Sequence, residues 1–466
     1  MTITARLANF CAGVSFETLP PEVAQRTPLL LLDLVGSIVR ARQEAVVAPP
    51  LLAAVQTLGF GKGQARVFGD AEGYAPAGSA FLNAALGHAL DFDDTHAAGT
   101  LHPGAPVIAA AIAAGELCQA TGADVLAGIV AGYETACRIA LALPAGDHYA
   151  RGFHPTATCG AFGAAAAAGR VFGLGPSGIE HAFGIALSQS AGSLQFLVNG
   201  GWTKPFQVGW AALSGLMAAT LAREGFVGAS EAIEGRHGFL QGHAPSPDPD
   251  RVVSDLGKRF ELMATAIKPW PSCRYGHAGI DAILALRSEY ELAPSEVEAV
   301  TYGLSNAGLL LVGAPEAKKQ NPQNLVDAQF SGPFVLSLAL ATGEVTWDGY
   351  GKLHDPVVRE LLPKVRCVHD PEIEAEFPTN MSGKVTIEAR GRTFVRKVIV
   401  PLGEPSNFLT LPALLEKFRS LATPFLGAHA DRLAQAALDV GQLDCITHLT
   451  GLASDRQERD TGMTNT

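Results

Sequence analysis

The chain has 466 residues and a net charge of −11, with 48% hydrophobic and 17% charged residues. This length exceeds what one hydrophobic core usually organises, and the composition is typical of a folded globular protein. The negative charge, without a cluster of Lys and Arg, argues against a nucleic-acid partner. The apolar runs are short and interrupted, and the N-terminus lacks a signal-peptide pattern, so we expect no membrane association. Seven cysteines without CxxC spacing indicate free thiols and a cytoplasmic location.

The first part of the chain has the pattern of packed helices. Pro21, placed in a first turn, predicts a helix that continues through residues 29–39. Small residues dominate several of the apolar faces, so neighbouring helices should approach closely. Apolar residues at helical spacing, separated by Gly and Pro breaks, predict further helices over residues 106–120, 123–143, 160–172, 176–190 and 211–224.

The pattern changes near residue 266. Alternating apolar residues predict strands over 297–304, 384–389 and 393–400, and the last two are joined by the hairpin signal Arg390-Gly391-Arg392. Helical spacing returns between and after these strands, over residues 278–289, 334–340, 411–421 and 428–438.

These elements predict a mainly α protein. We expect a large all-helical domain, formed by residues 1–265 plus 406–455, with an inserted smaller α+β lid domain over residues 266–405. The polar residues 456–466 are predicted to form a flexible tail.

The most informative stretch is the segment from His88 to His96, called here the His/Asp segment. It holds two histidines and three carboxylates in nine residues, and His102 follows. Such groups are costly to bury unless they are paired or used, so the density favours chemistry. One alternative is that Asp93 and Asp94 cap the next helix. Another is a divalent-metal site, as in a metal-dependent hydrolase, with ligands from His88, Asp91, Asp93 and Asp94.

A second candidate is His154, which precedes Pro155 and should therefore have extended or turn geometry ahead of an Ala-rich helix. The N–H groups at the start of a helix can bind a carboxylate. Alternatively, Thr156 or Thr158 is an ordinary N-cap residue, which does not exclude the functional interpretation.

Two further segments carry cationic groups. Lys204 lies beside Trp202 in a Gly-bounded loop, where it could neutralise a substrate carboxylate or be an ordinary surface lysine. Residues 267–277 supply several donors at the predicted domain junction, a common place for ligand sites, although a rigid linker is the alternative. The candidates in this segment are Lys268, Arg274, Tyr275 and His277.

Together these residues fit a small di- or polycarboxylic substrate. His102 and His154 are candidate bases for removing a proton α to a carboxylate, and the cationic side chains would stabilise the charge that develops. We expect no bound metal. A purely binding role is disfavoured, because reactive residues recur in four separate segments.

Six segments in this order and spacing resemble the MmgE/PrpD family over nearly the whole chain: Ala85–Thr95, Gly152–Thr156, Trp202–Pro205, Glu234–Phe239, Lys268–His277 and Ala328–Ser331. The family includes 2-methylcitrate dehydratase, cis-aconitate decarboxylase and iminodisuccinate epimerase. The resemblance implies a helical domain with an α+β lid, a homodimer, no cofactor and an active site between the domains. It also implies functional roles for Asp91, Thr95, His102, His154, Lys204 and Lys268.

Departures from the family pattern bear on the reaction. The decarboxylases carry a functional tyrosine after the first strand of the lid, whereas residues 307–312 here contain none. The dehydratase usually has Asn and Trp where this chain has Asp93 and His96. We therefore predict an epimerase of an iminodisuccinate-like substrate, with a hydro-lyase acting on a citrate-like acid as the alternative.

For the epimerase, His154 or Lys268 would remove the α-proton and a second base would return it on the opposite face. Lys204 and Arg274 would hold carboxylates. The remaining candidates for substrate binding are Asp91, Thr95, Tyr275 and His277.

Overall fold

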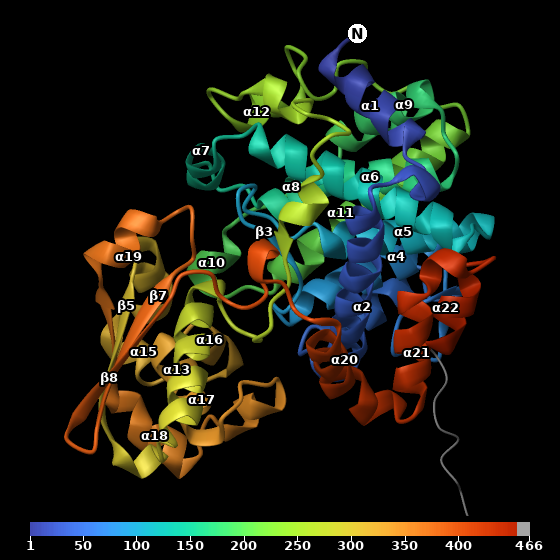
Figure 1. Cartoon of the computed structure of the whole chain (residues 1–466). Helices are drawn as coiled ribbons and strands as arrows, with labels where there is room; N and C mark the ends of the chain where they lie inside the picture. Colours follow the sequence, from blue (N-terminus) through green and yellow to red (C-terminus); the bar gives the residue numbers. More distant parts are fainter. Residues whose placement is uncertain (454–466) are drawn as a thin grey trace, which may run out of the picture. The chain divides into compact units, whose positions relative to one another are not determined.

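The computed structural model describes residues 1–453 and shows two compact units (Figure 1). The helical unit comprises Met1–Ala266 together with the segment from Leu411 onward, and the α+β unit comprises Ile267–Thr410. The prediction of a mainly α protein is confirmed. The predicted flexible tail, residues 456–466, lies outside the described residues.

The helical unit contains two short antiparallel strand pairs among its helices. Strand β1 (Ala65–Arg66) pairs with β2 (Gly73–Tyr74), and β3 (Thr95–His96) pairs with β4 (Thr265–Ala266). The helices before β4 are α1 (Ile3–Gly13), α2 (Pro21–Glu44), α3 (Ala48–Thr57), α4 (Pro76–Ala89), α5 (Gly104–Cys118), α6 (Gly122–Leu141), α7 (Ala145–Ala150), α8 (Pro155–Val171), α9 (Pro176–Leu187), α10 (Phe196–Asn199), α11 (Thr203–Arg223) and α12 (Phe239–His243).

Helix α8 is the centre of this unit and packs against α5, α6, α9 and α11 (Figure 1). Its sequence is almost entirely Ala and Gly after the first turn, and nearly every residue is buried. The small side chains permit close approach: a Cβ added at Gly163 would lie 2.8 Å from the carbonyl oxygen of Gly132 on α6. This confirms the expectation that small residues bring the helices together.

Two helices begin earlier than their apolar spacing predicts. Helix α8 starts at Pro155 and not at residue 160, and α11 starts at Thr203 and not at residue 211. Both have proline in the first turn, at Pro155 and Pro205, where the missing N–H has no helical partner to lose. Consequently Lys204 lies in the first turn of α11, and the expectation that it lies in a loop is wrong.

The C-terminal helices return to the N-terminal part of the helical unit. Helices α20 (Leu411–Leu426) and α21 (His429–Leu438) both pack against α2, and α22 (Thr447–Leu452) follows (Figure 1). Helix α2 is buried along most of its length, from Val23 to Ala41. Helices α20 and α21 therefore cover apolar surface of α2 that the N-terminal helices leave uncovered.

The α+β unit is built on a four-stranded sheet in the order β6-β5-β7-β8. Strand β5 (Val297–Leu304) runs parallel to β6 (Val365–His369) and antiparallel to β7 (Gly383–Ala389), which pairs with β8 (Arg392–Val398). Arg390 and Gly391 form the two-residue hairpin loop, both with positive φ, as the sequence predicts.

Helices α13 (His277–Tyr290) and α17 (Gly332–Thr342) pack on this sheet and on each other. After β5, the chain forms α14 (Asn306–Gly308) and then a π-helical turn over Leu309–Gly313. The shorter helices of the unit are α15 (Glu316–Lys319), α16 (Leu325–Gln329), α18 (Pro356–Leu361) and α19 (Pro371–Glu376).

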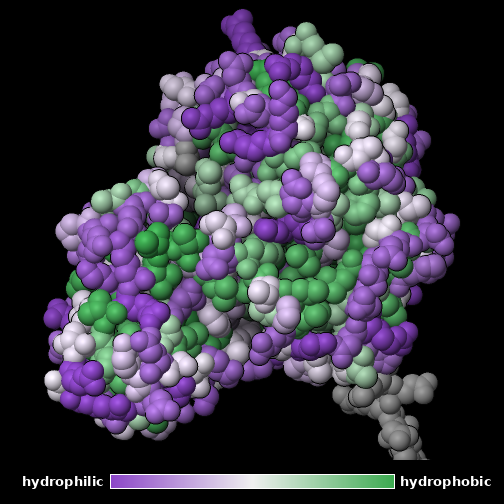
Figure 2. All heavy atoms as spheres, viewed as in Figure 1, coloured by the Kyte–Doolittle hydropathy of each residue, from purple (hydrophilic) through white to green (hydrophobic). Residues whose placement is uncertain are grey.

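Within the described residues, none of the helices combines the length and apolar character needed to cross a bilayer. The seven cysteines all lie in this part of the chain and none forms a disulfide, as predicted. Hydrophobic side chains nevertheless reach the surface of the helical unit in the view of Figure 2.

Candidate active site

The His/Asp segment forms the turn that connects α4 to β3. His88 lies in the last turn of α4, and Asp91 follows with a left-handed φ of 54°. Asparagine and aspartate tolerate this region better than other side chains with a Cβ atom. The turn sends Asp91, Asp93 and Asp94 in different directions, because each carboxylate has a different partner.

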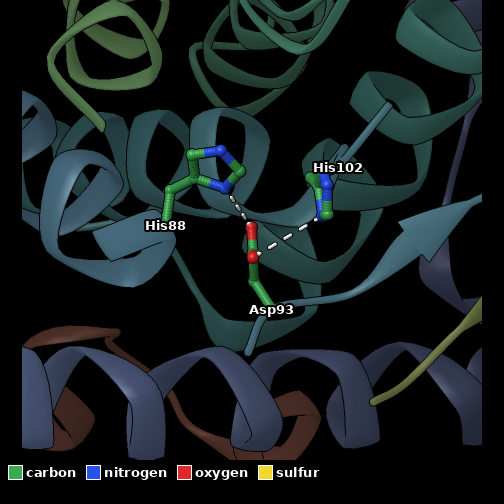
Figure 3. Close-up of side chains that lie close together, drawn as sticks. All are labelled: His88, Asp93 and His102. Atoms are coloured by element: carbon green, nitrogen blue, oxygen red, sulfur yellow. Dashed lines mark hydrogen bonds and ion pairs between the residues drawn. The ribbon is translucent and has the colours of Figure 1, made fainter. Parts of the chain in front are cut away.

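Asp93 connects two histidines, as Figure 3 shows. Its Oδ2 lies 2.7 Å from Nδ1 of His88, and its Oδ1 lies 3.6 Å from Nδ1 of His102. Both Asp93 and the His88 side chain are completely buried. The charge of a carboxylate at these distances attracts a positive charge on the neighbouring imidazoles, whereas burial opposes it.

His102 is oriented by its backbone surroundings as well. Its Nδ1 lies 2.6 Å from the carbonyl oxygen of Asp94, which requires a proton on Nδ1. The backbone N–H of His102 donates to Thr156 Oγ1 on α8 over 3.1 Å, and Thr95 Oγ1 lies 3.4 Å from Nδ1. The alternative that Thr156 or Thr158 is the N-cap residue is not what the structure shows: His154 is the N-cap residue, and Thr156 binds His102.

Asp94 anchors the other end of the turn. Its Oδ2 accepts a 2.6 Å hydrogen bond from the hydroxyl of Tyr133, and its Oδ1 accepts one of 3.0 Å from the N–H of Gly104. Gly104 is the first residue of α5, so Asp94 binds the first N–H of this helix, whereas the N-cap residue is Pro103. The alternative that Asp93 and Asp94 cap the next helix is therefore met only in part. Burial raises the pKa of Asp94 to about 8, with a further contribution from Asp93.

His154 has the opposite character from His102. Its Nδ1 lies 3.0 Å from Oε1 of Gln207 on α11, and the amide nitrogen of Gln207 donates to the carbonyl of Ser193 over 2.8 Å. This second bond fixes the orientation of the Gln207 amide, so Nδ1 of His154 carries the proton. Nε2 then carries the lone pair and can act as a base. Burial, followed by the charges of His88 and Lys204, holds the pKa of His154 well below its usual range.

Lys204 forms an ion pair with Asp91, with 2.6 Å between Nζ and Oδ1. Burial by itself lowers the pKa of Lys204, but the adjacent Asp91 carboxylate outweighs it and leaves the pKa above its ordinary value. Lys204 is therefore a permanent cation, suited to holding a carboxylate and not to removing a proton.

The helical unit thus gathers all five predicted residues that belong to it. The ring centroids of His88 and His102 are 4.9 Å apart, and those of His88 and His154 are 6.0 Å apart. His88 therefore has two histidines as neighbours: His102, which lies beside the Asp93 carboxylate, and His154, which is neutral. Environments that move the pKa values of two titratable groups in opposite directions are typical of paired acids and bases. The five predicted residues are Asp91, Thr95, His102, His154 and Lys204.

The other predicted residues belong to the α+β unit. Lys268 and His277 are both buried, and Nε2 of His277 lies 3.3 Å from the carbonyl oxygen of Ser272. Arg274 forms a two-bond ion pair with Glu404, with Nε 2.7 Å from Oε1. The backbone carbonyl of Tyr275 accepts a bond from Tyr302. Arg274 would therefore have to exchange Glu404 for a substrate carboxylate.

His88, Asp93 and His102 form a group of potential metal ligands within the described residues. The ligand atoms of His88, Asp93 and His102 all lie within 4.8 Å of one another. Two imidazole nitrogens and a carboxylate oxygen would suit a divalent transition metal. However, both Nδ1 atoms already have oxygen partners: Nδ1 of His88 lies in hydrogen-bonding distance of Asp93, and Nδ1 of His102 in that of the Asp94 carbonyl. The arrangement is therefore equally explained without a metal.

The sequence patterns did not predict several residues of the site. Gln207 follows Lys204 by three positions and so lies near it on the helix, a signal that was present but unused. Tyr133 is unremarkable inside its Ala-rich helix. Asp33 is a lone carboxylate in the apolar run of residues 29–39, and it forms a buried ion pair with Lys417. A charge in such a run is itself a signal.

The structure is a mainly helical scaffold that gathers histidines, carboxylates and a lysine in its helical unit. Sequence models of the MmgE/PrpD N-terminal domain and C-terminal domain match residues 5–252 and 270–441, and the chain belongs to this family.

Relatives of known activity are similar over nearly the whole length. A cis-aconitate decarboxylase-like protein of Aspergillus oryzae is 29% identical, with 97% of each chain covered. The cis-aconitate decarboxylase of Aspergillus terreus is also 29% identical, covering 97% of this chain and 95% of its own. The human cis-aconitate decarboxylase is 25% identical, covering 91% of this chain and 89% of its own.

Proposed function

We propose that this protein is a lyase acting on a small polycarboxylic acid of the aconitate or citrate type. The observation that carries the proposal is the contrast between His154, a buried neutral base, and His102, which lies beside the Asp93 carboxylate. The similarity to decarboxylases over 97% of the chain supports a lyase more than the epimerase predicted from the sequence.

In a decarboxylation, the bond between carbon and a carboxylate breaks, carbon dioxide leaves, and the electron pair stays on carbon. The cation of Lys204 would hold a remaining carboxylate and stabilise the developing charge. A protonated His102, favoured by Asp93, would then deliver a proton to that carbon.

A hydro-lyase is the second candidate, and one observation favours it. Residues 307–312, where the decarboxylases carry a tyrosine, contain none in this chain, which counts against decarboxylation. In this reaction His154 Nε2 would remove the proton α to a carboxylate, and His102 would protonate the leaving hydroxyl, so that water departs. The decarboxylation would use His102 and Lys204, and the hydro-lyase reaction would use His102 and His154; all three residues lie in the helical unit. Lys268 of the α+β unit stays a proposed catalytic residue.

The experiment is to incubate the purified protein separately with cis-aconitate and with 2-methylcitrate. Release of carbon dioxide from the first indicates a decarboxylase, and a rise in ultraviolet absorbance with the second indicates a hydro-lyase. If 2-methylcitrate is the substrate, His154→Gln should lower its kcat/KM by about 10²- to 10⁴-fold, because the base that removes the α-proton is lost. If neither substrate reacts while iminodisuccinate takes up deuterium from the solvent, the lyase proposal is wrong and the epimerase prediction stands.

The same assay tests the metal interpretation. Activity that survives exhaustive dialysis against a chelator supports a site without a metal. Loss of activity that zinc or another divalent ion restores would instead assign His88, Asp93 and His102 as ligands.

We also propose that the protein forms a homodimer through the exposed face of α11. Between its first and last turns, the exposed side chains of this helix are Phe206, Trp210 and Met217, each at least 40% accessible. Trp202, just before the helix, continues this stripe. Monomeric proteins rarely expose such a contiguous apolar surface, and an uncharged stripe suits pairing with its own copy.

A further inference from the structure

A buried lysine lies directly behind the His/Asp segment. Lys417, on α20, has its Nζ 2.6 Å from Oδ1 of Asp33 on α2, and both side chains are almost fully buried. The same Nζ donates a 3.0 Å hydrogen bond to the backbone carbonyl of Phe92 and lies 3.7 Å from the centre of the Phe92 ring. Three distant parts of the chain therefore meet at one ammonium group.

The position of Phe92 makes this contact relevant to catalysis. Phe92 separates Asp91, which pairs with Lys204, from Asp93, which lies between His88 and His102. Asp91 adopts a left-handed φ of 54°, a sparsely populated conformation that persists only where its surroundings impose it. A hydrogen bond to the Phe92 carbonyl fixes the peptide plane between the two aspartates.

The ion pair with Asp33 does not by itself explain why Lys417 is buried at this position. A buried ion pair contributes little net stability relative to apolar side chains of similar volume, so Asp33 and Lys417 are not needed to hold α2 against α20. Burial raises the pKa of Asp33 to about 6 even though Lys417 opposes the shift, which shows how unfavourable this location is for charge.

We propose that Lys417 is a positioning residue: by binding the Phe92 carbonyl, it holds the turn in which Asp91 and Asp93 face their respective partners. Asp33 in turn keeps the ammonium group in place. This inference rests on the proposed function of the site, because it assigns Lys417 an effect on the reaction that Asp91 and Asp93 support.

The decisive comparison is between Asp33→Asn and the double variant Asp33→Asn/Lys417→Met. Both remove the ion pair, but only the single variant retains a donor to the Phe92 carbonyl, since a lysine donates whether it is charged or neutral. We expect the single variant to keep most of its kcat. The double variant should lose about 10- to 100-fold in kcat, with a smaller change in KM, as expected for misplaced catalytic groups.

A purely structural pair predicts the reverse order. Asp33→Asn leaves a buried lysine without its carboxylate, whereas the double variant removes both charges and should then be the more stable and more active protein. Equal kcat values for the two variants, or a higher kcat for the double variant, would overturn the proposal.

A crystal structure of the double variant separates this proposal from the proposed lyase function. We expect the Phe92 peptide to rotate and Asp91 to leave the left-handed region, whatever substrate the enzyme uses. An unchanged turn, with Asp91 still at positive φ and bonded to Lys204, would refute the positioning role. Absence of lyase activity in the wild-type protein, with a rotated peptide in the variant, would refute only the proposed function.

Discussion

At the scale of single residues, the protonation state of His154 depends on its hydrogen-bond partner on α11. Gln207 holds the proton on Nδ1 and leaves Nε2 as the base. A carboxylate in the same place would favour the imidazolium form. We therefore expect Gln207→Glu to raise the pKa of His154 by one unit or more, as an adjacent opposite charge usually does.

The measurement is the pH dependence of kcat/KM. The base is active when deprotonated, so activity falls as the pH drops through its pKa, which in the wild-type protein lies well below the usual range. In Gln207→Glu this acidic limb should move to higher pH. Gln207→Leu serves as the control: it should lower kcat/KM without moving the limb upward. An acidic limb at the same pH in all three proteins would show that His154 is not the base.

Asp94 supports a second prediction, about stability. Burial raises its pKa from an ordinary value of 3.8 to about 8, so between these pH values the folded protein binds a proton that the unfolded chain does not. Its contribution to stability is complete below pH 4 and is lost as the pH rises toward 8. Asp94→Asn mimics the protonated acid and does not titrate.

We therefore expect the Tm of Asp94→Asn, relative to the wild-type protein, to increase steadily from pH 4 to pH 8. Thermal unfolding at several pH values measures this difference, and the other titrating groups cancel because both proteins share them. A difference that is constant with pH would show that Asp94 is ionised in the folded protein.

At the scale of elements, the positions of the proposed catalytic residues depend on how closely α8 approaches its neighbours. A Cβ added at Gly215 on α11 would lie 2.4 Å from Cβ of Ala164 on α8, closer than such atoms can pack. We expect Gly215→Ala to destabilise the protein by about 1–3 kcal/mol, as overpacking of a core does. It should also reduce activity, because α11 carries Lys204 and Gln207.

Gly242→Ala on α12 is the matched control. A Cβ at Gly242 has no atom within 4 Å, and alanine favours helices over glycine, so this change should be neutral or slightly stabilising. Urea denaturation of both variants tests the prediction. If both substitutions had the same effect, close packing of α8 and α11 would not be limiting.

The same elements show what a sequence can and cannot predict. Strand β5 has the bounds that its alternating pattern predicts, because a strand with one buried face records its burial directly in the sequence. The predicted starts of α8 and α11 lie several residues after the observed ones. The first turns of both helices are polar and contain proline, so apolar spacing gives no signal there.

The candidate site was predictable in its residues but not in its pairings. His102, His154 and Lys204 stand out because polar groups are unusual in so apolar a chain. The bond between His154 and Gln207 joins residues 53 positions apart, and that between Lys417 and Phe92 joins residues 325 apart. Such contacts follow from how helices pack, which the local sequence does not specify.

At the scale of the whole molecule, the exposed apolar stripe on α11 predicts how the chain associates. Trp210 and Met217 lie seven residues apart on one face of the helix, at 40% and 43% exposure. We expect the wild-type protein to be a dimer in sedimentation experiments. The double variant Trp210→Lys/Met217→Lys should be a monomer, because two copies would bring four added charges together in an apolar contact.

Leu58→Lys is the control, since this leucine is 70% exposed at the end of α3 and lies outside the stripe. It should leave the dimer intact. Because the stripe begins at Trp202, two residues before Lys204, a dimer formed here would also restrain the first turn of α11. We therefore expect the monomeric variant to have a higher KM than the control while its Tm, measured at the same protein concentration, shows that it remains folded. A wild-type monomer, or a charged variant that still dimerises, would refute this assignment of the interface.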